Sequence, residues 1–271
     1  MSASNTTGPV LWGVDVRGVA RVTLNRPEVN NAYNGELIQG LLAALDALGG
    51  VKDLRAVVIA GNGRHFQAGA DLKWIDGVRT ASHEENVRAS RATAEAVQRL
   101  NRAPVPTVAL VQGGCFGGGT GLIAACDVVI AAHNAVFSIA EVRWGLTAAI
   151  IVPQLNDAIG MRQMRRYALT GERFGAAEAR RIGLVHEVVP LDQLEAAGER
   201  IVGHILENGP DAIAQTKALI FESSWSDFDP DDAAFESLVE RHARKRQSAE
   251  AAEGLASFAE KRAAKWTPRK V

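Results

Sequence analysis

The sequence predicts an α/β fold, because short apolar runs of strand character alternate with segments of helical spacing along most of the chain. Residues 10–16 and 19–24 predict two strands joined by a tight Arg-Gly turn. Residues 34–48 then repeat leucine at helical intervals and predict an amphipathic helix. From about residue 191 the strands fade and only helical patterns remain.

Three further apolar runs are short enough to be buried strands. They are residues 57–60, 105–111 and 127–132. The charged segment 82–100 predicts a helix, which the Arg-Ala-Pro that follows brings to an end. A helix of small residues is expected at 122–127, between the second and third of these strands.

The C-terminal part of the chain predicts helices only. We divide the chain into an α/β core, residues 1–190, and a helical region, residues 191–271. Helices are expected at residues 191–208, 211–222 and 231–261, and the last of these carries many charges of both signs. Such a region either packs on a neighbouring subunit or stays a solvated surface, and the residues alone leave both open.

Composition excludes several classes of protein. The 271 residues are 47% hydrophobic and 23% charged, with a formal net charge of −1, which does not favour binding to nucleic acid or to an acidic membrane. The two cysteines form no disulfide framework, and neither they nor the histidines show metal-ligand spacing. No apolar run is long enough to span a membrane, and the polar N-terminus lacks a signal core. We therefore expect a cytoplasmic protein without a metal.

The most informative segment is a glycine run that follows the expected strand 105–111. Residues 113–121 read Gly-Gly-Cys-Phe-Gly-Gly-Gly-Thr-Gly, so six of these nine residues are glycine. Closely spaced glycines let backbone N–H groups approach a ligand, and the start of a helix would add partial positive charge. The run therefore predicts a site for a developing anion, in an enzyme or in a phosphate binder.

Of three interpretations of this run, the sequence excludes the P-loop and leaves two open. Residues 119–124 match G-x-G-x-x-A, the phosphate turn of dinucleotide folds, although that turn normally follows the first strand of its domain. Residues 113–120 resemble a P-loop, but Gly119 stands where the essential lysine belongs. The third interpretation is an oxyanion hole, which needs a second N–H from another loop. Residues 63–72 supply an Ala-Gly-Ala triplet before Asp71 that either fills this role or is merely a tight turn.

Four segments together resemble the crotonase, or enoyl-CoA hydratase/isomerase, superfamily over nearly the whole chain. They read Asn-Arg-Pro-Glu-Val-Asn-Asn-Ala at 25–32, Phe-Gln-Ala-Gly-Ala-Asp-Leu at 66–72, three glycines at 117–119 and Glu-Ala-Arg-Arg-Ile-Gly-Leu-Val at 178–185. The resemblance implies a crotonase-like ββα spiral core with a C-terminal helical trimerisation region, in a homotrimer or a dimer of trimers. It also implies an acyl-CoA thioester as substrate, with coenzyme A entering as part of that substrate and no separate cofactor.

The resemblance assigns the catalytic groups. The N–H groups that match the family's oxyanion hole belong to Ala70 and Gly118, with Gly117 beside them, and they would stabilise the enolate oxygen of the thioester. Glu141 matches one of two glutamates of the hydratases and lies in an apolar segment that would raise its pKa. A surface ion pair with Arg143 is the alternative for Glu141. The second glutamate would fall at position 121, which is Gly121.

Gly121 leaves the reaction open between a hydratase with a single glutamate, a Δ3-Δ2 enoyl-CoA isomerase and a non-catalytic acyl-CoA-binding member. Residues 66–75 and 141–151 look like bacterial glutaconyl-CoA hydratases of the methylglutaconyl and isohexenylglutaconyl types, which also carry glycine at this position. This resemblance favours hydration of a branched glutaconyl-type substrate. Such a substrate has a second carboxylate, for which Lys73 and Arg143 are the candidate cations.

The resemblance also implies residues that bind coenzyme A. Arg26 would lie near the pantetheine and phosphates, and the backbone of Ala68, Asp71 and Leu72 would border the adenine. Phe258 and Lys261 match a C-terminal pair that reaches the coenzyme A of a neighbouring subunit, with ordinary helix amphipathicity as the alternative. Trp74 is a candidate wall of the acyl pocket.

Overall fold

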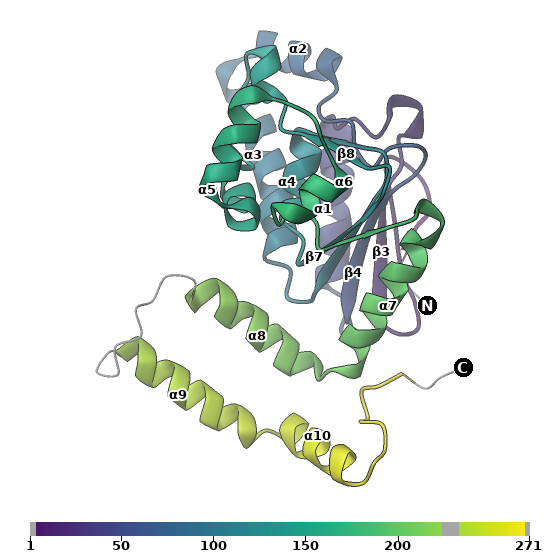
Figure 1. The fold of residues 1–271 in the computed structure, drawn as a ribbon, viewed down its shortest axis with the longest axis vertical. Coiled ribbons are helices and arrows are strands. Elements are labelled where there is room, and N and C mark those ends of the chain that lie inside the picture. Colours follow the sequence, from purple (N-terminus) through teal and green to yellow (C-terminus); the bar gives the residue numbers. More distant parts are fainter. Residues whose placement is uncertain (1–3, 224–232, 269–271) are drawn as a thin grey trace. The chain divides into compact units, whose positions relative to one another are not determined.

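The computed structural model describes residues 4–223 and 233–268. The chain divides into two compact units, one of residues 1–103 with 107–200 and the other of residues 104–106 with 201–271. The first unit is α/β and the second is helical (Figure 1). The predicted boundary after residue 190, between an α/β core and a helical region, stays a prediction.

A seven-stranded sheet forms the centre of the first unit, in the order β1-β2-β3-β4-β5-β7-β10. Strand β2 is antiparallel to β1 and β3, and all later neighbours are parallel, with Val22, Ile59, Ala109 and Val129 in register. The bounds are β1 (Ser4–Asn5), β2 (Val10–Val14), β3 (Val19–Leu24), β4 (Ala56–Gly61), β5 (Thr107–Val111), β7 (Val128–Ala132) and β10 (Glu187–Val189). The strands expected from the sequence are therefore present, with ends shifted by a few residues at most.

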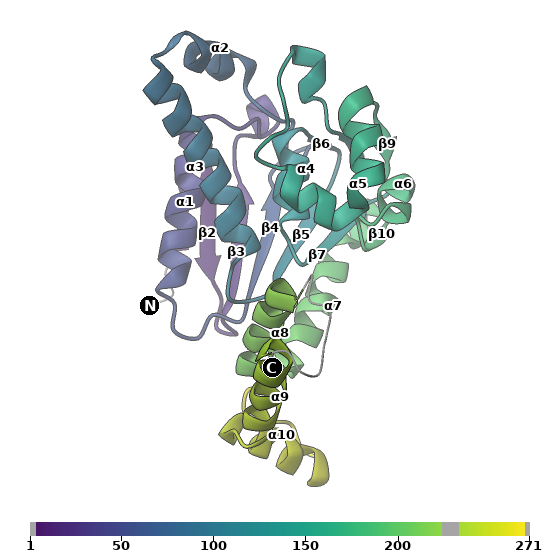
Figure 2. The same ribbon diagram turned by 90° about the vertical axis from the view of Figure 1, so that its left-hand side faces the viewer.

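Helices pack against this sheet (Figures 1 and 2). Helix α1 (Gly35–Gly49) buries its leucines against β2 and β3 and begins where the Asn34 side chain accepts the Leu37 N–H at 3.0 Å. Helix α3 (His83–Asn101) lies beside α1 and begins with a capping box between Ser82 and Glu85. The start of α7 (Leu194–Glu207) packs on β5, where Gly198 lies against Leu110.

The glycine run is not one loop. It begins with β6 (Gly114–Phe116), which pairs with β8 (Val136–Ser138) and through it with β9 (Phe174–Gly175) in a second, small sheet. At Gly117 the chain turns, with φ 50° and ψ −122°, a conformation that requires glycine. Helix α4 (Gly118–Ala124) follows at once, earlier than the helix expected at 122–127. Since residues 119–121 are buried inside α4, the phosphate-turn interpretation is wrong.

Several elements were not predicted. They are helices α2 (Leu72–Thr80), α5 (Val152–Thr170) and α6 (Ala176–Arg181) and the short 3-10 helices η1 (Pro27–Val29) and η2 (Glu141–Trp144), whereas η3 (Leu191–Gln193) is the first turn of the helix expected at 191–208. Helix α5 is kinked at Gly160, whose φ of 71° and ψ of 152° are not helical.

The second unit contains the end of α7, then α8 (Pro210–Ser223), α9 (Ala233–Arg246) and α10 (Ala249–Ala259). The single helix predicted at 231–261 is wrong, because the chain breaks before Ser248, whose side chain accepts the Ala251 N–H at 3.1 Å and caps α10. Residues 231 and 232 lie outside the described residues. Among the helices that the structure describes, none is long and apolar enough to cross a membrane.

Candidate active site

A pocket of about 350 Å³ in the first unit brings together residues from distant parts of the sequence. Of the predicted site residues, Trp74, Gly118 and Glu141 line it. Much of the rest of its wall is aliphatic and includes Ile150 and Ile151. The pocket is therefore apolar with a few polar groups, as expected of a site for an acyl chain.

Two backbone N–H groups near this pocket have no protein partner. The Tyr33 N–H donates to the Gly69 carbonyl at 2.8 Å and the Tyr33 carbonyl accepts the Asp71 N–H at 2.9 Å, so the residues on both sides of Ala70 are fixed. Gly118 is the first residue of α4. Within the part of the chain that the structure describes, neither the Ala70 nor the Gly118 N–H donates to a protein acceptor. Both amides are thus available to a ligand.

The two loops that carry these amides pack side by side. The Phe116 N–H donates to the Gln67 carbonyl at 2.9 Å, and the Gln67 N–H donates to the Gly114 carbonyl at 3.1 Å. A Cβ atom on Gly119 would lie 2.9 Å from Oε1 of Gln67, so only glycine allows this approach. The structure therefore brings the two predicted loops together, while their role as an oxyanion hole stays a prediction.

Glu141 places a carboxyl group beside these loops. A Cβ atom on Gly117 would lie only 3.0 Å from its Oε1, so the glycine makes room for the carboxyl group. Its buried Oε2 has no hydrogen-bond partner among the described residues, and burial raises the pKa of the Glu141 carboxyl. The alternative ion pair with Arg143 is not formed, because the Arg143 Nε donates to the Gly171 carbonyl at 2.9 Å. A carboxyl group of this kind can accept and return a proton near neutral pH.

The side chain of Ile151 fills the space beside Gly121. A Cβ atom on Gly121 would lie 2.1 Å from Cγ2 and 2.4 Å from Cβ of Ile151, which is 1% exposed. Ile151 also lines the pocket. An aliphatic side chain therefore occupies the place to which a second glutamate at position 121 would extend.

Two residues of the pocket wall were missed by sequence reasoning. The Tyr33 ring packs against Gly118 and lies edge-on to Trp74, with ring centres 5.8 Å apart. Arg79 is the cation that lines the pocket among the described residues, and its Nε and Nη2 donate to Oδ1 of Asp76 at 2.9 and 2.8 Å. The one sequence signal for Tyr33 is its position directly after the family-like segment 25–32.

The residues predicted to bind coenzyme A in the first unit form one connected loop cluster. Nη2 of Arg26 lies 3.5 Å from Oδ2 of Asp71, and Oδ1 of Asp71 accepts the Lys73 N–H at 3.1 Å and caps α2. The Ala68 N–H donates to the Asn30 carbonyl at 2.9 Å. Leu72 and Lys73 are exposed, and neither Lys73 nor Arg143 lines the pocket. Ala68, Asp71 and Leu72 are near Ala70 in the chain and Arg26 reaches them through Asp71, but their contacts with coenzyme A stay predictions.

Phe258 and Lys261 belong to the second unit. Phe258 is 86% exposed on α10, and Lys261 follows the helix with a left-handed φ of 52°. A fully exposed phenylalanine is consistent with a contact outside this chain. The predicted reach to a neighbouring subunit remains a prediction.

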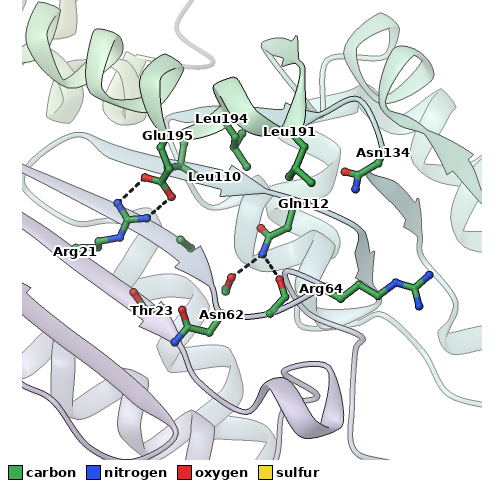
Figure 3. A pocket seen from close by; sticks show the side chains of 13 residues that line it. Arg21, Thr23, Asn62, Arg64, Leu110, Gln112, Asn134, Leu191, Leu194 and Glu195 are labelled. Carbon is green, nitrogen blue, oxygen red and sulfur yellow. Dashed lines mark hydrogen bonds and ion pairs between the residues drawn. The ribbon is translucent and has the colours of Figure 1, made fainter.

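A second pocket of about 340 Å³ lies between the strand ends and the start of α7 (Figure 3). Several of its polar side chains are already engaged: Arg21 donates to Glu195 at 2.8 Å, and Gln112 donates to the backbone carbonyls of Gly61 and Gly63 at 2.6 and 3.1 Å. None of the predicted site residues lines it. We therefore take the pocket of Glu141 as the candidate active site.

No group of three or more His, Cys, Asp or Glu side chains is arranged to hold a metal ion in the ranges that the structure describes. Catalysis without a metal stays a prediction from the sequence.

Comparison with known proteins decides the family. The family model described as enoyl-CoA hydratase/isomerase matches residues 15–269. The chain belongs to the enoyl-CoA hydratase/isomerase family. It is an enzyme of this family and has the crotonase fold, so the predicted superfamily and fold class are confirmed.

Members of the enoyl-CoA hydratase/isomerase family resemble the chain over nearly its full length. The mevalonyl-coenzyme A hydratase sidH of Aspergillus fumigatus is 34% identical over 258 residues, which cover 92% of each chain. The crystal structure of an enoyl-CoA hydratase from Shewanella pealeana has a TM-score of 0.89 at 34% identity and covers 96% of both chains. The structure of Pseudomonas aeruginosa AtuE has a TM-score of 0.90 at 36% identity and covers 96% of this chain and 100% of AtuE.

Proposed function

We propose that the protein hydrates an α,β-unsaturated acyl-CoA, with Glu141 as the acid/base and the Ala70 and Gly118 N–H groups as the oxyanion hole. The observation that carries the proposal is the half-buried Glu141 side chain, which lines the same pocket as Gly118 and whose buried Oε2 has no hydrogen-bond partner among the described residues. The hydratase names of relatives similar over most of their length add support.

The chemistry follows from these groups. Water forms a bond to Cβ while Glu141 takes its proton, and the double-bond electrons move onto the thioester oxygen. Two N–H donors aimed at that oxygen stabilise the enolate, each by about 3–4 kcal/mol in comparable sites. Glu141 then delivers the proton to Cα, and the carbonyl re-forms. One carboxylate is sufficient, because it accepts the proton first and donates it afterwards.

We further propose a branched glutaconyl-type acyl group. The wall of the pocket contains Arg79, whose exposed ion pair with Asp76 is of the kind that contributes only about 0–1 kcal/mol. A second carboxylate on the substrate could therefore compete for this guanidinium at little cost. Arg79 replaces Lys73 and Arg143 as our first candidate for this contact, since it lines the pocket and they do not.

The second candidate function is Δ3-Δ2 enoyl-CoA isomerisation, which moves a proton between carbons and adds no water. The Ile151 side chain fills the space beside Gly121, so no second carboxylate is available there to hold a water molecule. This observation favours isomerisation.

The test is a panel of purified acyl-CoA thioesters, each assayed for loss of enoyl absorbance by hydration and for gain of that absorbance from 3-enoyl substrates. We expect hydration, with kcat/KM at least about tenfold higher for glutaconyl-type substrates than for uncharged enoyl-CoAs of equal length. Isomerisation without hydration would support the second candidate. Hydration of uncharged substrates alone would retain the hydratase and refute the glutaconyl proposal. Cytoplasmic location and a trimeric or hexameric assembly stay predictions.

A further inference from the structure

Tyr33 lies beside the proposed catalytic groups and has no part in the mechanism so far. Its backbone is held on both sides of Ala70 by the two hydrogen bonds described above. Its ring contacts Trp74 edge-on at an interplanar angle of 69°. Both the backbone and the ring are therefore held in place, and Tyr33 is one of the residues that line the pocket.

The consecutive residues Gly117 and Gly118 leave room for the Glu141 carboxyl group and the Tyr33 ring, respectively. A Cβ atom on Gly117 would lie 3.0 Å from Oε1 of Glu141, and a Cβ atom on Gly118 would lie 2.7 Å from Cε1 of Tyr33. The three atoms nearest to that position on Gly118 all belong to the Tyr33 ring. Glu141 therefore packs against Gly117 and the Tyr33 ring against the adjacent Gly118, the residue whose N–H is proposed to bind the thioester.

Three other polar side chains of this wall are already engaged. Thr93 donates to the Ala89 carbonyl at 2.9 Å, Asn86 donates to the Val78 carbonyl at 3.1 Å, and Arg79 binds Asp76. The place next to Gly121, where a second glutamate would extend, is filled by Ile151. The phenol is thus the polar side chain that the structure packs against Gly118.

We propose that Tyr33 is a further catalytic residue, whose hydroxyl group holds, together with the Glu141 carboxylate, the water molecule that adds to Cβ. This role rests on the hydration proposed above. A water molecule fixed by one contact can still turn, whereas two contacts direct a lone pair towards Cβ. A phenol can supply either kind of contact, because its oxygen both donates and accepts hydrogen bonds.

The electrostatics fit a hydroxyl group that orients water and keeps its own proton. Burial and the negative charge of Glu141 raise the pKa of Tyr33 to about 12. The phenol therefore stays neutral at physiological pH, while Glu141 remains the group that takes the proton from water and passes it to Cα. No other proton acceptor is required, so the atoms of the hydration step balance.

The test is Tyr33→Phe, which removes the hydroxyl group and keeps the ring against Trp74 and Gly118. We expect kcat for hydration to fall about 10–100-fold, the usual effect of losing one hydrogen bond in an active site, with KM changed by less than about threefold. The matched control is Tyr167→Phe, the same change at the other of the two tyrosines. Tyr167 binds Glu178 away from the pocket, so its removal should leave kcat unchanged.

A second measurement separates the holding of water from damage to the site. Exchange of the Cα protons of a saturated acyl-CoA with D₂O, followed by proton NMR, requires Glu141 and the oxyanion hole but no attack at Cβ. We expect Tyr33→Phe to retain wild-type exchange while it loses hydration. Equal loss of both reactions, or unchanged hydration, would overturn the role of Tyr33. Wild-type protein that exchanges Cα protons but hydrates no substrate would instead overturn the proposed hydration, and with it this role.

Discussion

Glu141 and Ile151 line the same pocket, each beside a glycine of the same run, and have opposite character. At position 141, the missing side chain of Gly117 leaves room for a carboxyl group. At position 121, the missing side chain of Gly121 leaves room for the aliphatic Ile151. Two glycines of one short run thus accommodate side chains from the segment 141–151, one polar and one apolar. The difference shows that a glycine-rich loop serves both the reaction and the packing, and that neighbouring glycines are not interchangeable.

The largest expected effect tests the polar side of this comparison. Glu141→Gln keeps the size of the side chain but cannot exchange a proton, so we expect the proposed hydration rate to fall about 10²–10⁴-fold. Affinity for the acyl-CoA should stay nearly constant, because the nucleotide end is predicted to bind elsewhere. Stopped-flow rates and calorimetric affinities measure the two quantities.

Glu95→Gln is the matched control for this substitution. Glu95 lies on α3 outside the pocket and forms only an exposed pair with Arg99 at 3.6 Å. The hydration rate of the Glu95→Gln variant should equal that of the wild type. A fall of less than about tenfold for Glu141→Gln would mean that another residue transfers the proton.

An intermediate effect tests the apolar side. Gly121→Glu forces a side chain into Ile151, so we expect destabilisation by about 1–3 kcal/mol, or a Tm lower by about 2–12 °C, and no gain in hydration. The double variant with Ile151→Ala opens the space and should recover at least about half of the lost Tm. Calorimetry measures both.

Gly77→Glu is the control for the steric argument, because it makes the same change inside α2 at a glycine with nothing within 4 Å of a Cβ atom. Its Tm should change by less than about 2 °C. An unchanged Tm for Gly121→Glu itself would contradict the packing of Ile151 described here.

The sequence predicted the parts of this molecule that depend on local pattern. Buried strands such as β4 and the charged helix α3 have signals within a few residues, and the two amide-bearing loops were found by their glycines. The small sheet was missed because its strands have only two or three residues. Helix α2 was missed although Leu72, Ile75 and Val78 recur at helical spacing, because it has only 9 residues and buries none of them in the core.

The missed site residues depend on contacts between distant segments. Tyr33 gains its place by packing against Gly118, and Ile151 fills position 121, and neither contact has a signature in the local sequence. The break before Ser248 has a local signal, a serine cap, but the charged segment around it hides the boundary. Sequence patterns therefore identified some of the residues that line the pocket, and the others are identified only by their tertiary contacts.

The smallest expected effect concerns stability and needs no substrate. Burial raises the pKa of the Glu141 carboxyl in the folded state, so ionising it there costs more free energy than in the unfolded chain. The folded state is consequently penalised at pH 7, above the ordinary glutamate pKa of about 4.3. Glu141→Gln removes this penalty, and we expect its free energy of unfolding to exceed that of the wild type by about 0.5–2 kcal/mol at pH 7.

The gain in stability of Glu141→Gln should vanish as the pH falls towards 4, where the wild-type carboxyl is protonated in the folded state and increasingly so in the unfolded chain. Thermal unfolding of both proteins at pH 4 and pH 7 measures the difference, with Glu95→Gln expected to show no such pH-dependent gain. A Glu141→Gln protein less stable than the wild type at pH 7 would show instead that the ionised carboxylate is well solvated or paired, contrary to its assignment as a buried proton carrier.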